Sequence, residues 1–270
     1  MKTKSFLLCA LFAFNTAILH SQPTKPLKKV LELNITMKGG ANGAAVAWHP
    51  VLKRYYAAMA GNISYPLGIF DATGKLVSPD EQATLFDIRG MWYNPNSRTI
   101  QMNGYNANGW AEYALDAKGF PTEVKELYTG LIQPGEQSTG AFNPKENVLY
   151  FLNEEGNIQR YSVSDGSYMD DISLALGKTK KDGIEGDDNE EALGNYNGST
   201  VIYTGIGGAE LGLLNHLNKQ VELYNIKTGL LIKKFTFPDD APVPQFLNFS
   251  FSNGIYWLFD KEARIWKGYK

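Results

Sequence analysis

Five polar side chains share one position relative to an aromatic residue that follows them in the sequence. Each stands six positions before that aromatic residue: Asn42 before Trp48, Asp87 before Tyr93, Glu136 before Phe142, Glu190 before Tyr196 and Gln245 before Phe251. Arg89 lies two positions after Asp87, and therefore on the same side of an alternating strand. If these positions meet in space, their polar atoms suit a polyhydroxylated ligand or a hard cation.

The carboxylates among them offer a second chemistry. In glycoside hydrolysis one carboxyl group acts as acid and another as base or nucleophile, at a separation of about 5 to 9.5 Å. The candidates for these roles are Asp87, Glu136 and Glu190. A third interpretation needs no ligand, because the beginnings of strands that face water are polar in any case.

The aromatic residues belong to a repeated unit of about 50 residues, a period typical of solenoids and propellers. Its first element reads AWHPVLKRYY from position 47, WYNPNSRTIQ from 92 and AFNPKENVLY from 141, with weaker copies NYNGSTVIYT from 195 and SFSNGIYWLF from 250. A second element follows the first four copies: GIFDATGK, AEYALDAKG, QRYSVSDG and ELYNIKTG. The fifth copy ends with the chain.

Each unit reads as strand, tight turn, strand, loop, strand, glycine turn and strand, without a long amphipathic helix. Four short antiparallel strands per unit predict the blade of a β-propeller, so we expect an all-β fold with five blades. The fifth unit supplies only three strands. Residues 30–36 alternate apolar and polar side chains, and we expect them to complete the last blade and close the ring.

The blade that ends in Tyr, a polar residue and a Thr-Gly turn resembles the YVTN, YncE and WD40-like propellers. The resemblance extends over nearly all of residues 22–270 and implies the propeller fold. It carries no catalytic motif, so it implies no particular activity.

The N-terminal residues are typical of a secretory signal peptide. Lys2 and Lys4 precede an apolar run, and small and polar residues follow at 21 and 22, so we expect residues 1–21 to be removed and 22–270 to form one exported domain. The run is too short to span a membrane. Removal of Cys9 leaves no cysteine for disulfide or thiolate chemistry. With 24 basic and 28 acidic residues remaining, the mild acidity argues against a nucleic-acid partner.

Three other candidate sites are better explained by structure than by chemistry. His49 occupies the slot that Asn94 and Asn143 fill before a proline, which predicts a turn residue. His216 has no histidine or cysteine partner nearby, so the sequence supports neither a zinc site nor a Ser-His-Asp triad. The acidic run 182–191 offers oxygen ligands to calcium, but its spacing is not that of an EF-hand and a solvated loop is favoured. We therefore expect no cofactor, with calcium as a weak alternative.

The expected connections divide the two faces of the ring. A tight-turn face receives the turns between first and second strands and between third and fourth strands. A long-loop face receives the other connections, including GIGGAELGLLNHLNK, and function concentrates on such loops. There Tyr65, Tyr105 and Asn106 are candidates for ligand contact. The five tryptophans are expected to pack in the blades: Trp48, Trp92, Trp110, Trp257 and Trp266.

Two functions follow from these patterns. The favoured one is an exported binding or scaffold propeller that contacts a protein, peptide or glycan through its long-loop face. The predicted contact residues are Asn42, Tyr65, Asp87, Arg89, Tyr105, Asn106, Glu136, Glu190 and Gln245. The alternative is a glycan-active hydrolase that uses the carboxylates of this set, but fold alone does not establish an activity.

Overall fold

The computed structural model describes residues 24–176 and 193–270. The predicted signal peptide at 1–21, the acidic run 182–191 and the candidate residue Glu190 lie outside this part of the chain. Within it, no helix is long and apolar enough to cross a membrane.

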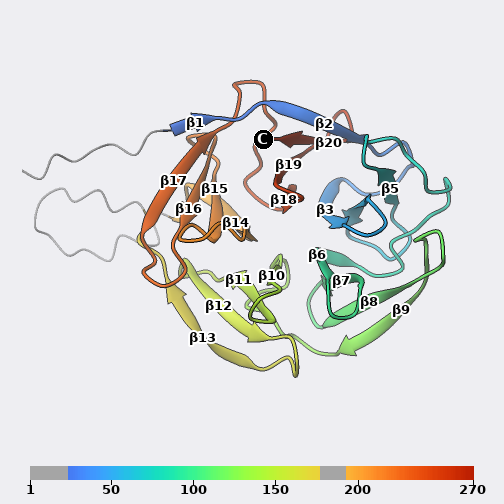
Figure 1. Cartoon of the computed structure of the whole chain (residues 1–270), viewed down its shortest axis with the longest axis horizontal. Coiled ribbons are helices and arrows are strands. Elements are labelled where there is room, and N and C mark those ends of the chain that lie inside the picture. The colour runs from blue at the N-terminus through green and yellow to red at the C-terminus, as the bar shows by residue number, and fades with distance from the viewer. Residues whose placement is uncertain (1–23, 177–192) are drawn as a thin grey trace, which may run out of the picture.

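Five antiparallel sheets stand around a central axis, and Figure 1 looks along that axis. Blade one contains β3 (Asn42–His49), β4 (Arg54–Ala60) and β5 (Leu67–Asp71), and blade two contains β6 (Ile88–Asn94), β7 (Thr99–Gly104), β8 (Trp110–Leu115) and β9 (Pro121–Tyr128). Blade three contains β10 (Ala141–Asn143), β11 (Val148–Leu152), β12 (Asn157–Ser162) and β13 (Tyr168–Ser173). The predicted five-bladed β-propeller is confirmed.

The last two blades complete the ring. Blade four contains β14 (Tyr196–Tyr203), β15 (Leu211–Asn215), β16 (Gln220–Tyr224) and β17 (Leu231–Thr236), and blade five contains β18 (Phe249–Ser252), β19 (Ile255–Asp260), β20 (Ile265–Tyr269) and β2 (Lys29–Asn34). Blade one has only a remnant of its fourth strand, in which Leu76 bridges Phe70 and the Val77 amide donates to the carbonyl of Ile69. The four-strand pattern predicted from the repeat therefore extends around the ring.

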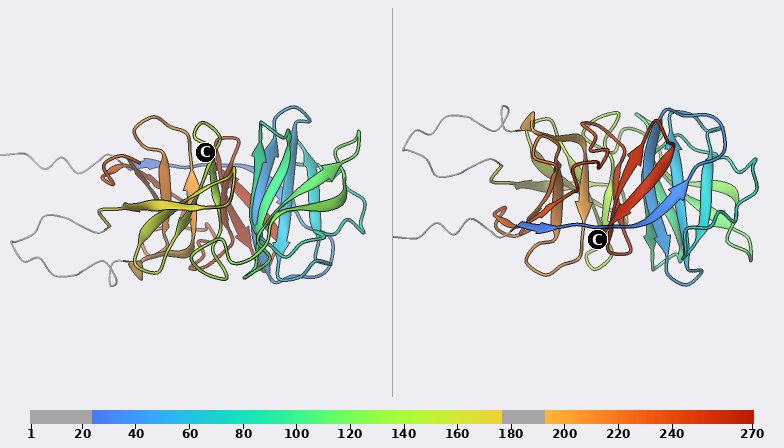
Figure 2. Two further views of the ribbon diagram at one scale, coloured as in Figure 1. Left: turned by 90° about the horizontal axis from the view of Figure 1, so that it is seen from below. Right: turned by 90° about the horizontal axis from the view of Figure 1, so that it is seen from above.

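The N-terminal segment closes the ring as predicted. β2 pairs antiparallel with β20, from Lys29 opposite Tyr269 to Asn34 opposite Ile265. A further strand, β1 (Thr24–Pro26), pairs parallel with β17 on the outer edge of blade four. Figure 2 shows this segment running along the side of the ring, across two neighbouring blades. It covers two sheet edges that would otherwise be free to pair with another chain.

The inner strand of blade four has a different register from the one expected from the sequence. Tyr196 begins the inner strand β14, whereas the aromatic residue before its turn is Tyr203. The pair Asn197-Gly198 suggested a turn, but the Asn197 side chain instead donates to the carbonyls of Pro244 and Leu247. The residues that follow form an irregular part of β14. The segment expected as one long loop contains β15, so its first part lies on the tight-turn face.

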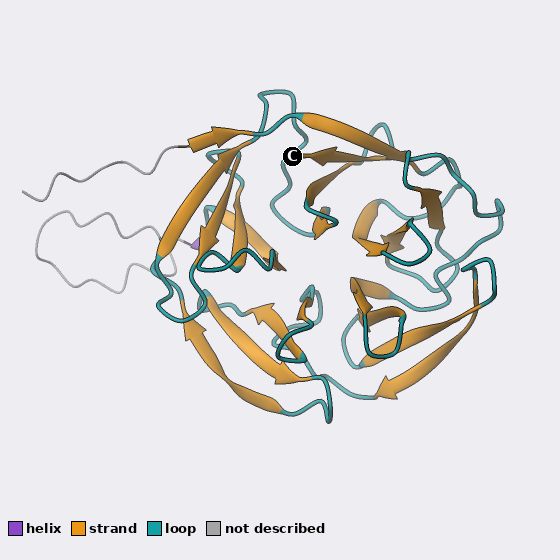
Figure 3. Cartoon of the chain, viewed as in Figure 1, coloured by secondary structure: helices purple, strands orange, loops and turns teal. Residues whose placement is uncertain are grey.

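Five clusters of buried apolar side chains fill the spaces between neighbouring blades. Figure 3 shows the strands of each blade, whose faces these clusters hold together. The expected packing of tryptophans holds for Trp92, Trp110, Trp257 and Trp266, which are all buried, while Trp48 is half-buried. Each large apolar side chain removed from water contributes about 1.5 to 3 kcal/mol, so these interfaces hold the inner strands in place.

Candidate functional site

The residues predicted at the strand beginnings form a hydrogen-bonded network on the long-loop face. Arg89 is buried, and its Nη1 donates to Oδ1 of Asp87 at 2.6 Å while its Nε donates to Oε1 of Gln137 at 2.6 Å. The same Asp87 oxygen accepts the backbone amide of Gly61. Arg89 and Asp87 therefore form an ion pair, in which each charge has its partner inside the protein.

Tyr105 joins Glu136 to this network. The Tyr105 hydroxyl donates to Oε2 of Glu136 at 2.8 Å, and the Arg89 guanidinium lies 4.7 Å from the centre of the Tyr105 ring. Its hydrogen bond to Glu136 raises the pKa of Tyr105 above the usual 10.0. Asn106 contributes its backbone amide, which donates to the carbonyl of Glu136. The loop that follows β7 is therefore fastened to the connection between blades two and three.

Of the other predicted members, Asn42 and Gln245 contact neighbouring segments, and Glu190 lies outside the described residues. Asn42 accepts a hydrogen bond from Nδ2 of Asn248, whose Oδ1 accepts the Gly43 amide. The Gln245 side chain is exposed, and its carbonyl accepts the Gly198 amide. With the corrected register, the position predicted for Glu190 is taken by the buried amide of Asn197.

Two further candidates also have internal partners. Tyr65 is half-buried against the buried cluster between blades five and one, close to glycines of the neighbouring loops: Gly39, Gly40 and Gly61. His49 is buried, its Nδ1 accepts the amide of Leu52 at 3.3 Å, and its Nε2 lies 3.1 Å from the carbonyl of Arg98. These contacts require the neutral tautomer with the proton on Nε2. The prediction of His49 as a turn residue is confirmed.

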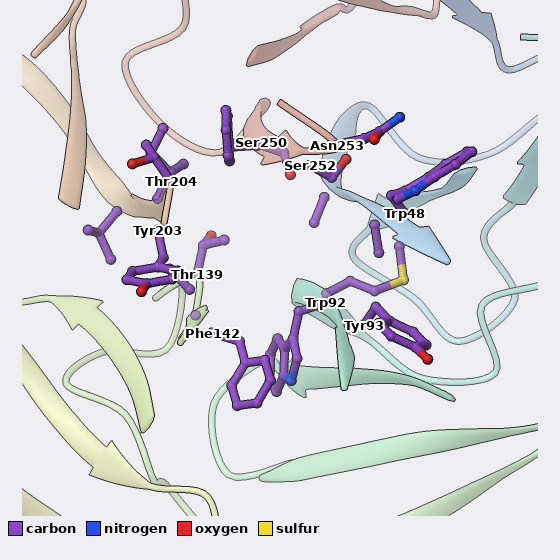
Figure 4. A pocket seen from close by; sticks show the side chains of 18 of the residues that line it. Trp48, Trp92, Tyr93, Thr139, Phe142, Tyr203, Thr204, Ser250, Ser252 and Asn253 are labelled. Carbon is purple, nitrogen blue, oxygen red and sulfur yellow. The ribbon is translucent and has the colours of Figure 1, made fainter. Parts of the chain in front are cut away.

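A pocket opens at the opposite end of the central axis, on the tight-turn face. All five inner strands contribute to it, together with turn residues Pro50, Pro144, Gly205 and Asn253. We call it the central pocket, and it has a volume of about 360 Å³. Figure 4 shows its aromatic and hydroxyl-bearing side chains around the open space. Loop length could not reveal this site, because, apart from the turn that contains Gly205, the turns that line it are short.

The aromatic residues of the repeat form the wall of the central pocket. One such residue precedes the turn in each blade: Trp48, Tyr93, Phe142, Tyr203 and Phe251. They also pack against neighbouring blades, as shown by ring-centre distances of 4.6 Å between His49 and Tyr93, 6.1 Å between Trp92 and Phe142, and 5.9 Å between Tyr150 and Tyr203. The aromatic residues that mark the repeat in the sequence are therefore also a signal of the pocket. Their spacing, however, indicated only the repeated blade and not a binding site.

The polar groups of the central pocket are few and uncharged. Among the described residues that line it there is no Asp, Glu, His, Lys or Arg. Thr139 is 4% exposed, and its hydroxyl has no hydrogen-bond partner. The indole nitrogen of Trp48 and the hydroxyl of Tyr203 likewise have no partner within residues 24–176 and 193–270. A tyrosine hydroxyl is neutral at physiological pH, and burial raises the pKa of Tyr203 further above its usual 10.0.

The described residues show no arrangement suited to a metal ion. In these parts of the chain, no three His, Cys, Asp or Glu side chains gather as ligands would. The weak calcium alternative concerns 182–191, which lies outside them.

The fold and pocket define a five-bladed β-propeller with an uncharged, aromatic central site. No family model matches the sequence, and no curated protein matches it. Among solved structures, the chain is similar to the glutaminyl cyclase of Myxococcus xanthus, with a TM-score of 0.53, 8% identity, and coverage of 92% of this chain and 97% of that one. This likeness shows the fold.

Two weaker structural similarities also emerge. An auxiliary nutrient binding protein from Bacteroides thetaiotaomicron has a TM-score of 0.45 and 12% identity, over 86% of this chain and 60% of that one. The hydrazine synthase of Kuenenia stuttgartiensis has a TM-score of 0.46 and 10% identity, over 83% and 82%.

Proposed function

We propose that this propeller is an exported binding module whose ligand occupies the central pocket. The observation that carries the proposal is a pocket at the common axis of five blades, with aromatic walls and no ionisable side chain among the described residues that line it. Small-molecule sites are typically concave and largely apolar, with a few polar groups that fix orientation. The predicted signal peptide supports action outside the cytoplasm.

Binding without turnover fits the described chemistry better than hydrolysis does. A glycosidase needs two carboxyl groups beside the bond that breaks. The described residues that line the central pocket include no carboxyl group, while Asp87 and Glu136 lie at the strand beginnings, hydrogen-bonded to Arg89 and Tyr105. Incubation with oligosaccharides should therefore produce no new reducing ends, and their appearance would restore the hydrolase alternative.

A blocking substitution tests the location of the site. Pro144 is exposed and lines the central pocket, whereas Pro95 is exposed in the same turn slot of blade two and does not line it. We expect Pro144→Trp to obstruct the pocket and Pro95→Trp to leave it open. Residues 22–270 of both variants would be applied to immobilised oligosaccharides and peptides. Capture by the parent protein and by Pro95→Trp, but not by Pro144→Trp, is the expected result; equal capture by all three would place the ligand elsewhere.

A second candidate is a protein partner on the long-loop face, as the loop lengths first indicated. Large apolar side chains stand exposed on connections of that face: Ile63, Leu85, Leu131, Leu217 and Phe246. Ile63 and Phe246 are 60% and 63% exposed. Exposed apolar surface is a feature of interaction sites. For a partner held there, replacing Ile63 and Phe246 by Ser should weaken the complex, and Pro144→Trp should not.

A further inference from the structure

The ligand of the central pocket must be compatible with its electrostatics. No charged side chain lines it among the described residues. A charged ligand would lose hydration there without gaining a counter-charge, which is costly. An uncharged ligand avoids this cost, so the pocket favours neutral ligands over charged ones.

The hydroxyl of Thr139 adds a requirement for polarity. A buried hydroxyl without a partner is destabilising, and two other hydroxyl groups that line the pocket do have polar neighbours. Thr200 Oγ1 lies 3.3 Å from Ser199 Oγ, and Ser250 Oγ accepts the amide of Val46. Among the buried polar atoms of the described residues that lack a partner, the Thr139 hydroxyl oxygen alone lines the pocket. A ligand hydroxyl would satisfy it once the Thr139 side chain turns this buried oxygen toward the open space.

The walls of the pocket add a requirement for shape. The half-buried indole of Trp48 presents a flat apolar surface, and its Nε1–H is free to donate. Tyr203 combines a half-buried ring with a free hydroxyl on another side of the pocket, as Figure 4 shows. Flat apolar faces beside free hydroxyl and N–H groups match the ring of a sugar, whose C–H face is apolar and whose edge carries hydroxyl groups.

We propose that the central pocket binds a neutral saccharide, with the Thr139 hydroxyl bonded to a sugar hydroxyl and Trp48 against a sugar ring. This inference rests on the proposed function and names its ligand class. An apolar peptide side chain would leave the Thr139 hydroxyl unpaired. A quaternary ammonium group would find aromatic faces but no carboxylate among the described lining residues.

Calorimetry with defined probes tests the ligand class. The probes are cellohexaose, xylohexaose, mannohexaose and chitohexaose as neutral saccharides, with hexagalacturonate, tetramethylammonium and a proline-rich peptide as the competing classes. We expect at least one neutral saccharide to bind the parent protein and the Pro95→Trp variant but not Pro144→Trp. If only the peptide or tetramethylammonium shows this pattern, the saccharide proposal is overturned and the proposed function stands. If no probe binds in a manner sensitive to Pro144→Trp, both fail.

A pair of hydroxyl deletions tests the role of Thr139. Thr139→Val removes the unpartnered hydroxyl with little change in shape, whereas Thr99→Val removes a buried hydroxyl that donates to the Tyr113 carbonyl at 2.6 Å outside the pocket. We expect Thr139→Val to weaken saccharide binding about threefold to tenfold without lowering the unfolding midpoint. Thr99→Val should lower that midpoint and leave affinity unchanged. Unchanged affinity in Thr139→Val would refute the proposed hydrogen bond and with it the saccharide assignment.

Discussion

The Nε of Arg89 donates a 2.6 Å hydrogen bond to Oε1 of Gln137, which links the inner strand of blade two to the connection that leads into blade three. Asp87 supplies the opposite charge to the same buried guanidinium. The carboxylate predicted as a ligand contact therefore has a structural task that its position in the sequence did not reveal.

Asp87→Asn should accordingly lower the free energy of unfolding by about 1 to 3 kcal/mol, because it leaves the buried Arg89 charge without its partner. Urea denaturation measures the change. In the double variant with Arg89→Met, the loss should be smaller than the sum of the two single losses. An Asp87→Asn variant as stable as the parent would show that the ion pair contributes nothing.

His49→Asn should be mildly destabilising, by about 1 kcal/mol, because asparagine cannot also span the contact from His49 Nε2 to the Arg98 carbonyl of the neighbouring blade. The repeat alone suggested a silent change, since asparagine fills this slot in two sister blades. Urea denaturation at alkaline pH isolates this hydrogen-bond loss, because the histidine is then neutral in both folded and unfolded protein. Equal stability of the two proteins there would support the simpler expectation from the repeat.

The parent should also lose stability as the pH falls below 6.5, and His49→Asn should lack that part of the loss. Burial lowers the pKa of His49 below the usual 6.5, so the unfolded chain binds the proton at a higher pH than the folded chain does. The contribution of neutral His49 to the free energy of unfolding is complete above pH 6.5. It disappears as the pH falls through the pKa that His49 has in the folded protein. Unfolding midpoints across this range test the assignment, and parallel curves for parent and variant would contradict it.

Buried tyrosines should make the protein lose stability as the pH rises into the alkaline range, the opposite direction from the effect of His49. Burial raises the pKa of Tyr113 and Tyr150 far above the usual 10.0, and the same holds for Tyr196 and Tyr224, whose hydroxyls both donate to the buried Glu222. A group whose pKa is higher in the folded than in the unfolded protein stabilises the fold. For these tyrosines the stabilisation is complete below pH 10 and is lost at higher pH. Absorbance should show these phenols ionising together with unfolding; their smooth ionisation in a folded protein would contradict the burial.

Truncation separates the two N-terminal strands. A chain that begins at residue 29 keeps β2 and the closed ring, whereas one that begins at 36 loses the partner of β20 and the buried side chains Leu33 and Ile35. We expect the shorter chain to unfold at a lower temperature and to aggregate through its exposed edge. Size-exclusion chromatography and thermal unfolding compare the two. Equal behaviour would mean that β2 does not close the fold.

The sequence predicted the architecture because each blade repeats the same physical pattern. An aromatic residue, a turn side chain and an alternating strand recur in blades one, two, three and five, and the side chains of His49, Asn94 and Asn143 accept amide hydrogen bonds at the equivalent turns. Blade four departed from the pattern because Asn197-Gly198 looks like a turn. Its amide is used instead between blades, a contact with residues far along the chain that local sequence cannot display.

The site was harder to predict for a related reason. Long loops directed attention to the face where Asp87, Tyr105 and Glu136 lie, but those side chains bind one another. The central pocket depends on how closely the five inner strands approach the axis, which the packing between blades determines. Thr139 carries no sequence signal, since its unpartnered hydroxyl is a property of the assembled ring.

The pairing of β2 with β20 imposes an order on biogenesis. The ribosome makes β2 before, and β20 after, all strands of the other four blades, so the closing blade cannot form until those blades have been synthesised. Until β20 emerges, the inner strand of blade five has no bridge to β2 and the ring stays open. The pairing of β20 with β2 is therefore the step that locks the five blades into one closed structure.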